Sequence, residues 1–245
     1  MKVLVIIPAA GLGTRMAVPA KTGKRTGPSK QFTEISGTPI LILTLRKFAA
    51  AESVNEIYVA LPKGEVGQFK TRLDKENLGK KVHLVEGGEN RQQSVANALA
   101  QVKAEAEDVV LVHDAVRPFV DSEIIRNVIA AAQKHGAAIA GVPAMDTVKQ
   151  VERTADGAIV ATTIPRERVV QAQTPQGFRF SVIKQAFDEA LADGFTGTDE
   201  ASLAERAGHE VAVVMGSARN IKITTPADLE LAEFYLSQEK TSDRG

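Results

Sequence analysis

The 245-residue sequence contains no cysteine and no tryptophan, and aromatic residues make up only 4% of it. The absence of cysteine excludes disulfide bonds and thiolate metal sites, and it is typical of proteins from a reducing compartment. No apolar run approaches the roughly 18 residues needed to cross a bilayer, and the run after Lys2 ends at Pro8, too early for a secretion signal. We therefore expect a cytoplasmic protein without a membrane partner.

Acidic residues are absent between Met1 and Thr33, although the whole chain balances 30 Lys+Arg against 30 Asp+Glu. The same stretch holds six cations, and five of them fall in the loop GLGTRMAVPAKTGKRTGPSK, which follows the apolar run VLVII. A cationic loop at the carboxyl end of the first strand of an α/β domain commonly holds polyphosphates. The sequence thus predicts a site for a nucleoside triphosphate. With no general basic excess and few aromatics, nucleic acid is not an expected partner.

Short β-branched runs alternate with longer helical patterns along the chain. The predicted strands are Lys2–Ile7, Glu56–Leu61, Val82–Val85, Val109–Val112, Ala137–Val142 and Val211–Val214. The predicted helices are Pro39–Ala51, Gly64–Asn77, Arg91–Lys103, Ser122–His135, Val182–Ala192, Glu200–Ala207 and Ala227–Leu236. This alternation favours an α/β fold, a Rossmann-like domain with a mostly parallel sheet covered on both faces.

The alternation stops between Pro143 and Pro175, where no amphipathic helix is found. We interpret residues 143–175 as an extended β-arm that protrudes from a single domain spanning residues 1–236, followed by a polar tail at 237–245. A long exposed ribbon is prone to pair with other strands, so we expect the arm to form a homodimer.

The first loop matches neither of two familiar phosphate-binding motifs. Met16 stands where a dinucleotide fingerprint needs its third glycine, and the P-loop pattern GxxxxGK[ST] is absent. What remains is a turn at Gly11 and Gly13 whose backbone N–H groups can face an anion. Arg15 and Lys30 would add fixed positive charge beside phosphoryl oxygens.

Two other positions, Asp114 and Lys222, are also compatible with the binding of phosphates and a metal ion. Asp114 follows the strand Val109–Val112, where one carboxylate suits Mg²⁺ or another divalent cation, although an ion pair with Arg117 explains it equally well. Lys222 lies in a short apolar strand, where an ammonium is costly unless an anion meets it. Asp199 and Glu200 are sufficiently explained as a helix cap and a first-turn acid.

Eight stretches, in order over almost the whole chain, resemble the 2-C-methyl-D-erythritol 4-phosphate cytidylyltransferase family of the non-mevalonate isoprenoid pathway. They are PAAGLGTRM, SKQF, EGGENRQQSV, LVHDAVRPF, PAMDTVKQ, TIPRERVVQAQTPQGF, TDEASLAE and NIKITTPADLELAEFYL. The resemblance implies a nucleotidyltransferase α/β domain, a dimerising arm, and CTP and a polyol phosphate as substrates. The segment before Lys30 is longer than is usual in the family.

The resemblance also implies a role for individual residues. Arg15 and Lys30 correspond to the cations that stabilise the transition state, and Arg166 and Lys222 to the pair that positions the acceptor phosphate. The positions implied for binding Mg²⁺-CTP are Ala9, Ala10, Gly11, Gly13, Gly88, Ser94 and the metal-binding Asp114. The positions implied for the second substrate are Arg117, Thr147, Thr174 and Thr198, of which Thr147, like Arg166, would reach the site of the other subunit.

Three other functions stay open from the residues alone. The same build serves cytidylyl transfer to ribitol 5-phosphate, and a similar first loop occurs in sugar-1-phosphate nucleotidyltransferases. A non-catalytic nucleotide-binding protein on this fold is the third, although the intact set of Arg15, Lys30, Asp114, Arg166 and Lys222 argues against it.

Overall fold

The structure is a computed structural model that describes residues 1–11 and 30–242. Its strands are β1 (Val3–Pro8), β2 (Glu34–Ile35), β3 (Thr38–Pro39), β4 (Glu56–Leu61), β5 (Lys81–Glu86), β6 (Val109–Val112), β7 (Ala137–Pro143), β8 (Val148–Thr154), β9 (Gly157–Ile164), β10 (Val170–Arg179) and β11 (Ala212–Met215). Its α-helices are α1 (Ile40–Ala50), α2 (Val66–Leu73), α3 (Arg91–Leu99), α4 (Ser122–His135), α5 (Phe180–Ala192), α6 (Glu200–Arg206) and α7 (Pro226–Ser242). Short 3₁₀ turns include η2 (Lys30–Phe32), η3 (Lys63–Glu65) and η4 (Arg166–Arg168).

Seven strands form the central sheet, in the order β11-β7-β10-β6-β1-β4-β5. Only β10 runs antiparallel to its neighbours, β6 and β7; the other pairs are parallel. From β1 the chain first adds β4 and β5 on one side and then crosses back to β6 on the other. This reversal leaves a crevice at the carboxyl ends of β1 and β6, the place where α/β sheets usually bind ligands.

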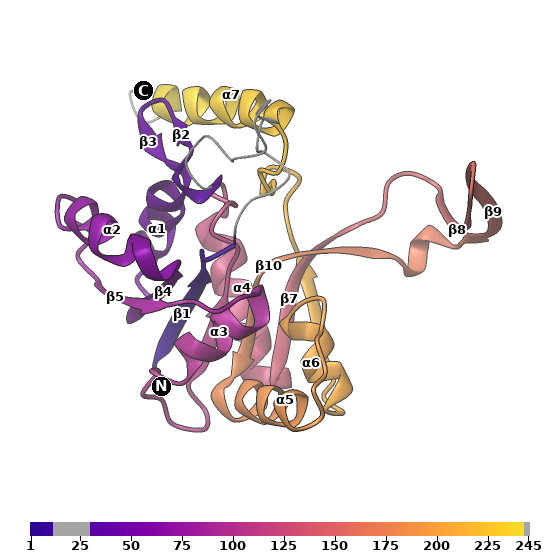
Figure 1. Ribbon diagram of the computed structural model, residues 1–245, viewed down its shortest axis with the longest axis horizontal. Coiled ribbons are helices and arrows are strands. Elements are labelled where there is room, and N and C mark those ends of the chain that lie inside the picture. Colours follow the sequence, from indigo (N-terminus) through magenta and orange to yellow (C-terminus); the bar gives the residue numbers. More distant parts are fainter. Residues whose placement is uncertain (12–29, 243–245) are drawn as a thin grey trace.

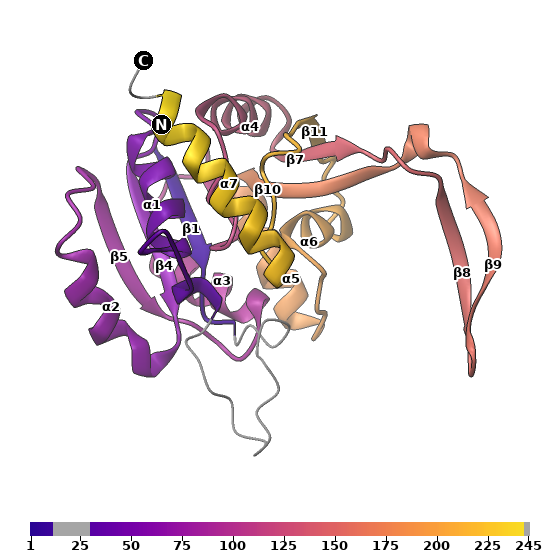
Figure 2. The ribbon, with the colours of Figure 1, turned by 90° about the horizontal axis from the view of Figure 1, so that it is seen from above.

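Helices cover both faces of the sheet (Figure 1). One face packs against α1, α2 and α4, and its core includes Val5, Leu45 and Val128. The other face packs against α3, α5 and α6 around Ile6 and Phe178. Successive residues of β1 enter opposite cores because strand side chains alternate between faces. A third cluster joins α7 to α1 and to the loop after β6, and Figure 2 shows α7 lying across the end of the domain.

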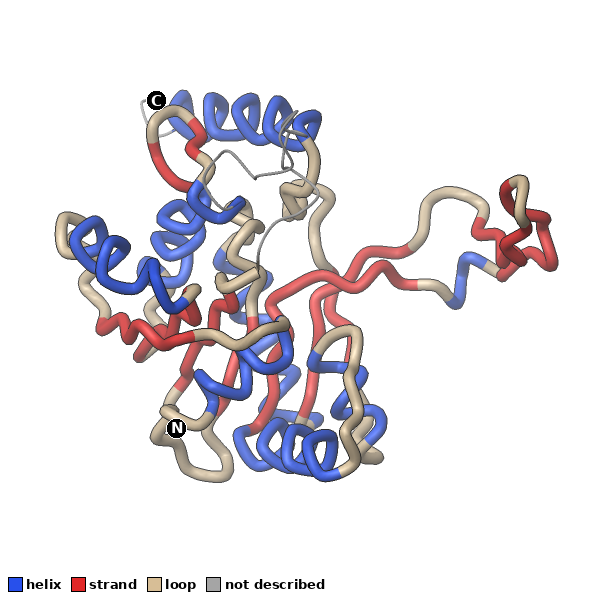
Figure 3. The backbone as a smooth tube through the Cα atoms, in the orientation of Figure 1, coloured by secondary structure: helices blue, strands red, loops and turns tan. Residues whose placement is uncertain are grey.

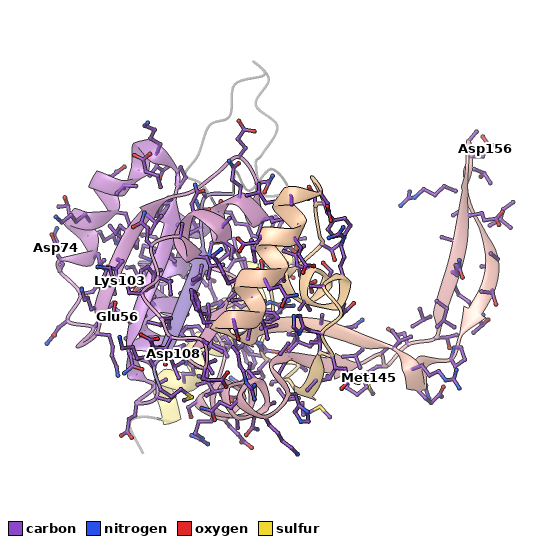
Figure 4. All side chains as sticks on the ribbon, turned by 90° about the horizontal axis from the view of Figure 1, so that it is seen from below. Glu56, Asp74, Lys103, Asp108, Met145 and Asp156 are labelled. Atoms are coloured by element: carbon purple, nitrogen blue, oxygen red, sulfur yellow. The ribbon has the colours of Figure 1, made fainter. Side chains whose placement is uncertain are left out.

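The arm continues from two strands of the sheet. β7 and β10 pair side by side and lead outward, and a separate antiparallel hairpin of β8 and β9 forms the end (Figure 3). Met145 lies near the place where the arm leaves the body, and Asp156 lies at the far tip (Figure 4). Nearly every residue of the hairpin is exposed. The predicted protruding β-arm is therefore present in the fold.

Most predicted elements are confirmed, and the differences have local causes. β4, β6 and α4 have the predicted bounds, and Asp121 and Gly136 begin and end α4 as expected. β10 was not predicted as a strand of the central sheet. Its central Pro175 lacks the N–H of a regular ladder residue and lies in a register shift between Ala172 and Gln176. α7 continues to Ser242, past the expected start of the polar tail, and Glu239 pairs with Lys47 of α1 at 2.9 Å.

Within residues 1–11 and 30–242, no helix is both long enough and apolar enough to span a bilayer. The cytoplasmic location stays a prediction.

Candidate active site

The loops that follow β1, β5 and β6 meet at the crevice beside the reversal of strand order. They enclose a cavity of about 170 Å³. Its lining residues are Pro8, Ala9, Ala10, Gly11, Lys30, Gln31, Arg91, Ser94, Asp114, Ala115, Val116 and Lys222. A larger hollow of about 840 Å³, lined by Phe32, Phe69 and mixed charges, lies beside α2, away from the carboxyl ends of β1 and β6. Because the smaller cavity gathers cations around one carboxylate, we take it as the candidate site.

Close backbone contact shapes one wall of the cavity. A Cβ atom on Gly87 would lie 2.3 Å from Cβ of Ala10, so only glycine lets the loops after β1 and β5 approach this closely. The next N–H, that of Gly88, donates to Oγ of Ser94 at 3.1 Å, and this hydroxyl donates to Asn90 O at 2.7 Å. Asn90 caps α3. The glycine pair therefore lets the loop after β5 pack closely against Ala10 and the start of α3.

Asp114 is the buried acidic centre of the site. Its Oδ2 lies 2.9 Å from Nζ of Lys222 and 3.2 Å from Nε of Arg117, and its Oδ1 lies 3.4 Å from Nε of Arg91. Burial alone would raise the pKa of Asp114, but Arg91, Lys222 and Arg117 hold it well below the usual range. The carboxylate is thus ionised at any physiological pH.

Arg91 is itself held by a second buried carboxylate, Glu200. Nη1 of Arg91 donates to both oxygens of Glu200, at 2.6 and 2.8 Å. Burial acts to lower the pKa of Arg91, but the charges of Glu200 and Asp114 outweigh it and hold that pKa above its ordinary value. Burial raises the pKa of Glu200, and the Arg91 charge opposes the rise. The interpretation of Glu200 as a plain first-turn acid was therefore incomplete, whereas Asp199 caps α6 as predicted.

Hydrogen bonds from His113 and Thr174 fix the backbone of Asp114. Nε2 of His113 lies 3.0 Å from Arg117 O, and because a carbonyl only accepts, that nitrogen carries the ring proton. Nδ1 then accepts from Oγ1 of Thr174 at 3.1 Å, and the same hydroxyl accepts from the Asp114 N–H at 3.0 Å. Burial lowers the pKa of His113 to about 4, which agrees with a neutral ring.

The structure brings most of the predicted site residues together. Those that line the cavity are Ala9, Ala10, Gly11, Lys30, Ser94, Asp114 and Lys222. Gly88, Arg117 and Thr174 contact this set, and Thr198 lies on the exposed loop before α6, with its N–H donating to Ser202 Oγ at 3.1 Å.

Besides Thr198, four further predicted residues are not placed at the cavity. Thr147 and Arg166 are exposed on the arm, where Nη1 of Arg166 donates to Met145 O at 2.7 Å. Gly13 and Arg15 lie outside the described residues.

Five residues at the site were not among those predicted from the sequence: Gly87, Gln31, Arg91, Glu200 and Asn220. Gln31 and Asn220 are buried polar side chains, and within the described chain Nε2 of Gln31 and Oδ1 of Asn220 have no hydrogen-bond partner. Asn220 nevertheless joins the site, because its side-chain Nδ2 donates to Thr174 O at 2.8 Å and its backbone carbonyl accepts from Nη1 of Arg117 at 2.7 Å. For Arg91, the sequence signal that could have identified it was its position directly after the GGEN motif.

This site can hold a divalent cation only together with a bound ligand that supplies further oxygen atoms to the metal. In the described part of the chain, no three His, Cys, Asp or Glu side chains gather as a ready-made metal site. Mg²⁺ bound to a triphosphate takes one or two protein carboxylates and draws its other ligands from phosphates and water. Oδ1 of Asp114, with only a 3.4 Å contact to Arg91, is the oxygen that suits this role.

A mostly parallel α/β sheet with cations and one carboxylate at its strand reversal defines a class of nucleotide-binding proteins that act on phosphate groups. The sequence model of one family, 2-C-methyl-D-erythritol 4-phosphate cytidylyltransferase, matches residues 3–238. The chain belongs to this family, and it is therefore an enzyme of the nucleotidyltransferase class.

Individual relatives agree with this assignment. The 2-C-methyl-D-erythritol 4-phosphate cytidylyltransferase of Acidobacterium capsulatum is 56% identical over 241 residues, which cover 98% of this chain and 100% of that protein. The protein of the same name from Bacillus cereus is 43% identical, over 96% of this chain and 98% of its own. The crystal structure of the Francisella tularensis enzyme matches with a TM-score of 0.78 at 35% identity, covering 96% of this chain and 99% of that one. The α/β fold is confirmed by this match.

Proposed function

We propose that this chain transfers the cytidylyl group of CTP to the phosphate of 2-C-methyl-D-erythritol 4-phosphate and releases pyrophosphate. The observation that carries the proposal is the family match over residues 3–238, together with the cationic cavity around Asp114. The family match does not favour ribitol 5-phosphate as the acceptor.

The reaction depends on positive charge and on the positioning of the two substrates more than on a general base. An oxygen of the acceptor phosphate attacks the α-phosphorus of CTP, and the bond from that phosphorus to the bridging oxygen of the β-phosphate breaks. A phosphomonoester is already nucleophilic at neutral pH, so the cost lies in bringing two anions together and supporting charge on phosphorus. Lys30 and Lys222, which line the cavity, supply positive charge for this purpose, and we assign Arg15 the same role.

We propose that Mg²⁺ serves as the metal, held by Asp114 and the nucleotide phosphates. When bound, it would neutralise phosphate charge and hold the triphosphate in one conformation. The protein's own contribution is to keep Asp114 ionised and fixed, through its three cations and through Thr174.

We also propose that two copies associate through the arm. Val151, Ile159 and Val160 on the hairpin are 46%, 65% and 55% exposed, and near the arm's base the exposed apolar residues are Met145, Val170, Val213 and Met215. Exposed apolar surface of this extent on a ribbon is characteristic of protein–protein contact. A second subunit would cover it, and a two-fold arrangement would bring Thr147 and Arg166 to the partner's cavity.

Pyrophosphate release tests the reaction directly. With CTP and Mg²⁺, we expect release with 2-C-methyl-D-erythritol 4-phosphate and none with ribitol 5-phosphate or without acceptor. Release with ribitol 5-phosphate alone would overturn the assigned acceptor. CTP binding without release for either acceptor would support the non-catalytic alternative.

A further inference from the structure

Arg91 and Glu200 form a buried pair between two helices that are distant in sequence. Arg91 is the first residue of α3 and Glu200 the first residue of α6, and the two are 109 positions apart. The side chain of Glu200 is 1% exposed, whereas that of Arg91 is 30% exposed and lines the cavity. Glu200 therefore touches the site through Arg91.

The guanidinium of Arg91 bridges two carboxylates. Nη1 is engaged by Glu200, and Nε points toward Oδ1 of Asp114 at 3.4 Å. A planar guanidinium can make both contacts from one position, which a lysine ammonium cannot do with the same geometry. Glu200 thus fixes Arg91 and offsets its charge at the same time.

We propose that Glu200 is a positioning residue that sets, through Arg91, the balance between anion and divalent-cation binding in the cavity. The inference rests on the proposed function, because it assumes that the cavity receives a triphosphate. Asp114 pairs with Lys222, Arg117 and Arg91, Glu200 pairs with Arg91 alone, and Lys30 lines the same cavity. Without the Glu200 carboxylate, the net charge of the site would be more positive by one unit. Phosphate would then bind more strongly and a divalent cation beside Asp114 more weakly.

A purely structural role for Glu200 predicts a different result. If the pair only holds α3 and α6 together, its loss loosens the cavity and weakens every ligand. The charge effect instead strengthens the binding of metal-free CTP and reduces the gain in affinity that Mg²⁺ brings. One unit of charge about 10 Å from the bound phosphates, at an effective dielectric constant of about 20, changes affinity roughly tenfold.

Calorimetry with CTP, in EDTA and then with Mg²⁺, measures both quantities. In E200Q we expect metal-free CTP to bind roughly tenfold more tightly and the gain from Mg²⁺ to shrink. In R91Q we expect metal-free CTP to bind more weakly and the gain in affinity from Mg²⁺ to increase. The double variant R91Q/E200Q should return both toward the wild-type values, because the missing charges cancel.

Glu76→Gln is the matched control, because Glu76 pairs with Arg46 at 2.8 Å outside the cavity lining. It should change neither affinity. Weaker metal-free CTP binding in E200Q, or behaviour equal to E76Q, would overturn the inference. If E200Q does not fold, R91Q and the double variant test the inference through the changes in the two affinities expected for each of them. Failure of the wild-type chain to bind CTP would count against the proposed function instead.

Discussion

The hydroxyl of Thr174 is fully oriented before any ligand arrives. Its proton is donated to Nδ1 of His113, and one lone pair accepts from the Asp114 N–H. Toward a substrate, Thr174 can therefore only accept a hydrogen bond through its remaining lone pair. The predicted substrate contact at Thr174 thus has a defined direction, because the neutral His113 ring determines which atom holds the proton.

Protonation of His113 should destabilise the fold. Its pKa is about 4 in the folded protein against an ordinary value of 6.5, so the unfolded chain takes up this proton first as the pH falls. Between pH 6.5 and 4 we expect the free energy of unfolding to drop by about 3 kcal/mol from this residue. Chemical denaturation at a series of pH values measures the slope.

His113→Asn should flatten this slope, whereas His135→Asn, at an exposed position at the end of α4, should leave it unchanged. The comparison is cleanest above pH 4.5, because the carboxylates with lowered pKa values, such as Glu56 and Asp108, lose their contribution only at lower pH. Glu200, whose pKa is raised, acts with the opposite sign but is present in both variants. Equal slopes in the two variants would show that His113 does not cause the effect.

At the scale of elements, the short helix α6 links stability to the site. Oδ1 of Asp199 accepts from the Ser202 N–H at 3.0 Å, and Oδ2 accepts from Nε2 of Gln176 at 2.8 Å. Gln176 belongs to β10 and also accepts from the Ala201 N–H at 3.0 Å. The start of α6, and with it Glu200, is therefore held against the sheet.

Asp199→Ala should lower both stability and activity. Loss of an N-cap costs about 1 kcal/mol of unfolding free energy. Because α6 begins with Glu200, we also expect a lower kcat/KM. Asp121→Ala is the matched control, since Asp121 caps α4 through the Ile124 N–H at 2.8 Å, and it should lose similar stability with no loss of kcat/KM. Equal kcat/KM in the two variants would contradict the link between α6 and the site.

The same elements show what sequence could and could not predict. β1, β4, β6 and α4 follow from uniform apolar runs and one clear cap, so their bounds are nearly those predicted. β10 escaped prediction because its sequence VQAQTPQGFR alternates poorly and contains a proline.

At the site, the residues adjacent to strand ends were predictable, since the carboxyl ends of parallel strands gather in one place. The Arg91–Glu200 pair was not, because its partners are 109 residues apart and no local pattern relates them. The role of Arg15 stays a prediction, and we expect Arg15→Ala to lower kcat far more than it weakens CTP binding.

At the scale of the whole molecule, the predicted site is divided between two parts that do not meet within one chain. Lys222 and Asp114 lie at the cavity, whereas Thr147 and Arg166 lie exposed on the arm, whose hairpin shares no strand pairing with the main sheet. A chain that completes its site with the arm of a second copy reconciles these positions with the family roles.

Mixing two inactive variants tests this arrangement. Arg166→Ala damages only the arm, and Lys222→Ala damages only the cavity, so each homodimer should be nearly inactive. In a mixed dimer, one site combines the intact cavity of the first chain with the intact arm of the second. Random pairing should therefore restore roughly a quarter of the wild-type kcat, because half of the dimers are mixed and each has one working site. Pyrophosphate release after co-refolding measures the recovery, and light scattering confirms the dimer. No recovery despite dimer formation would mean that each arm serves its own chain.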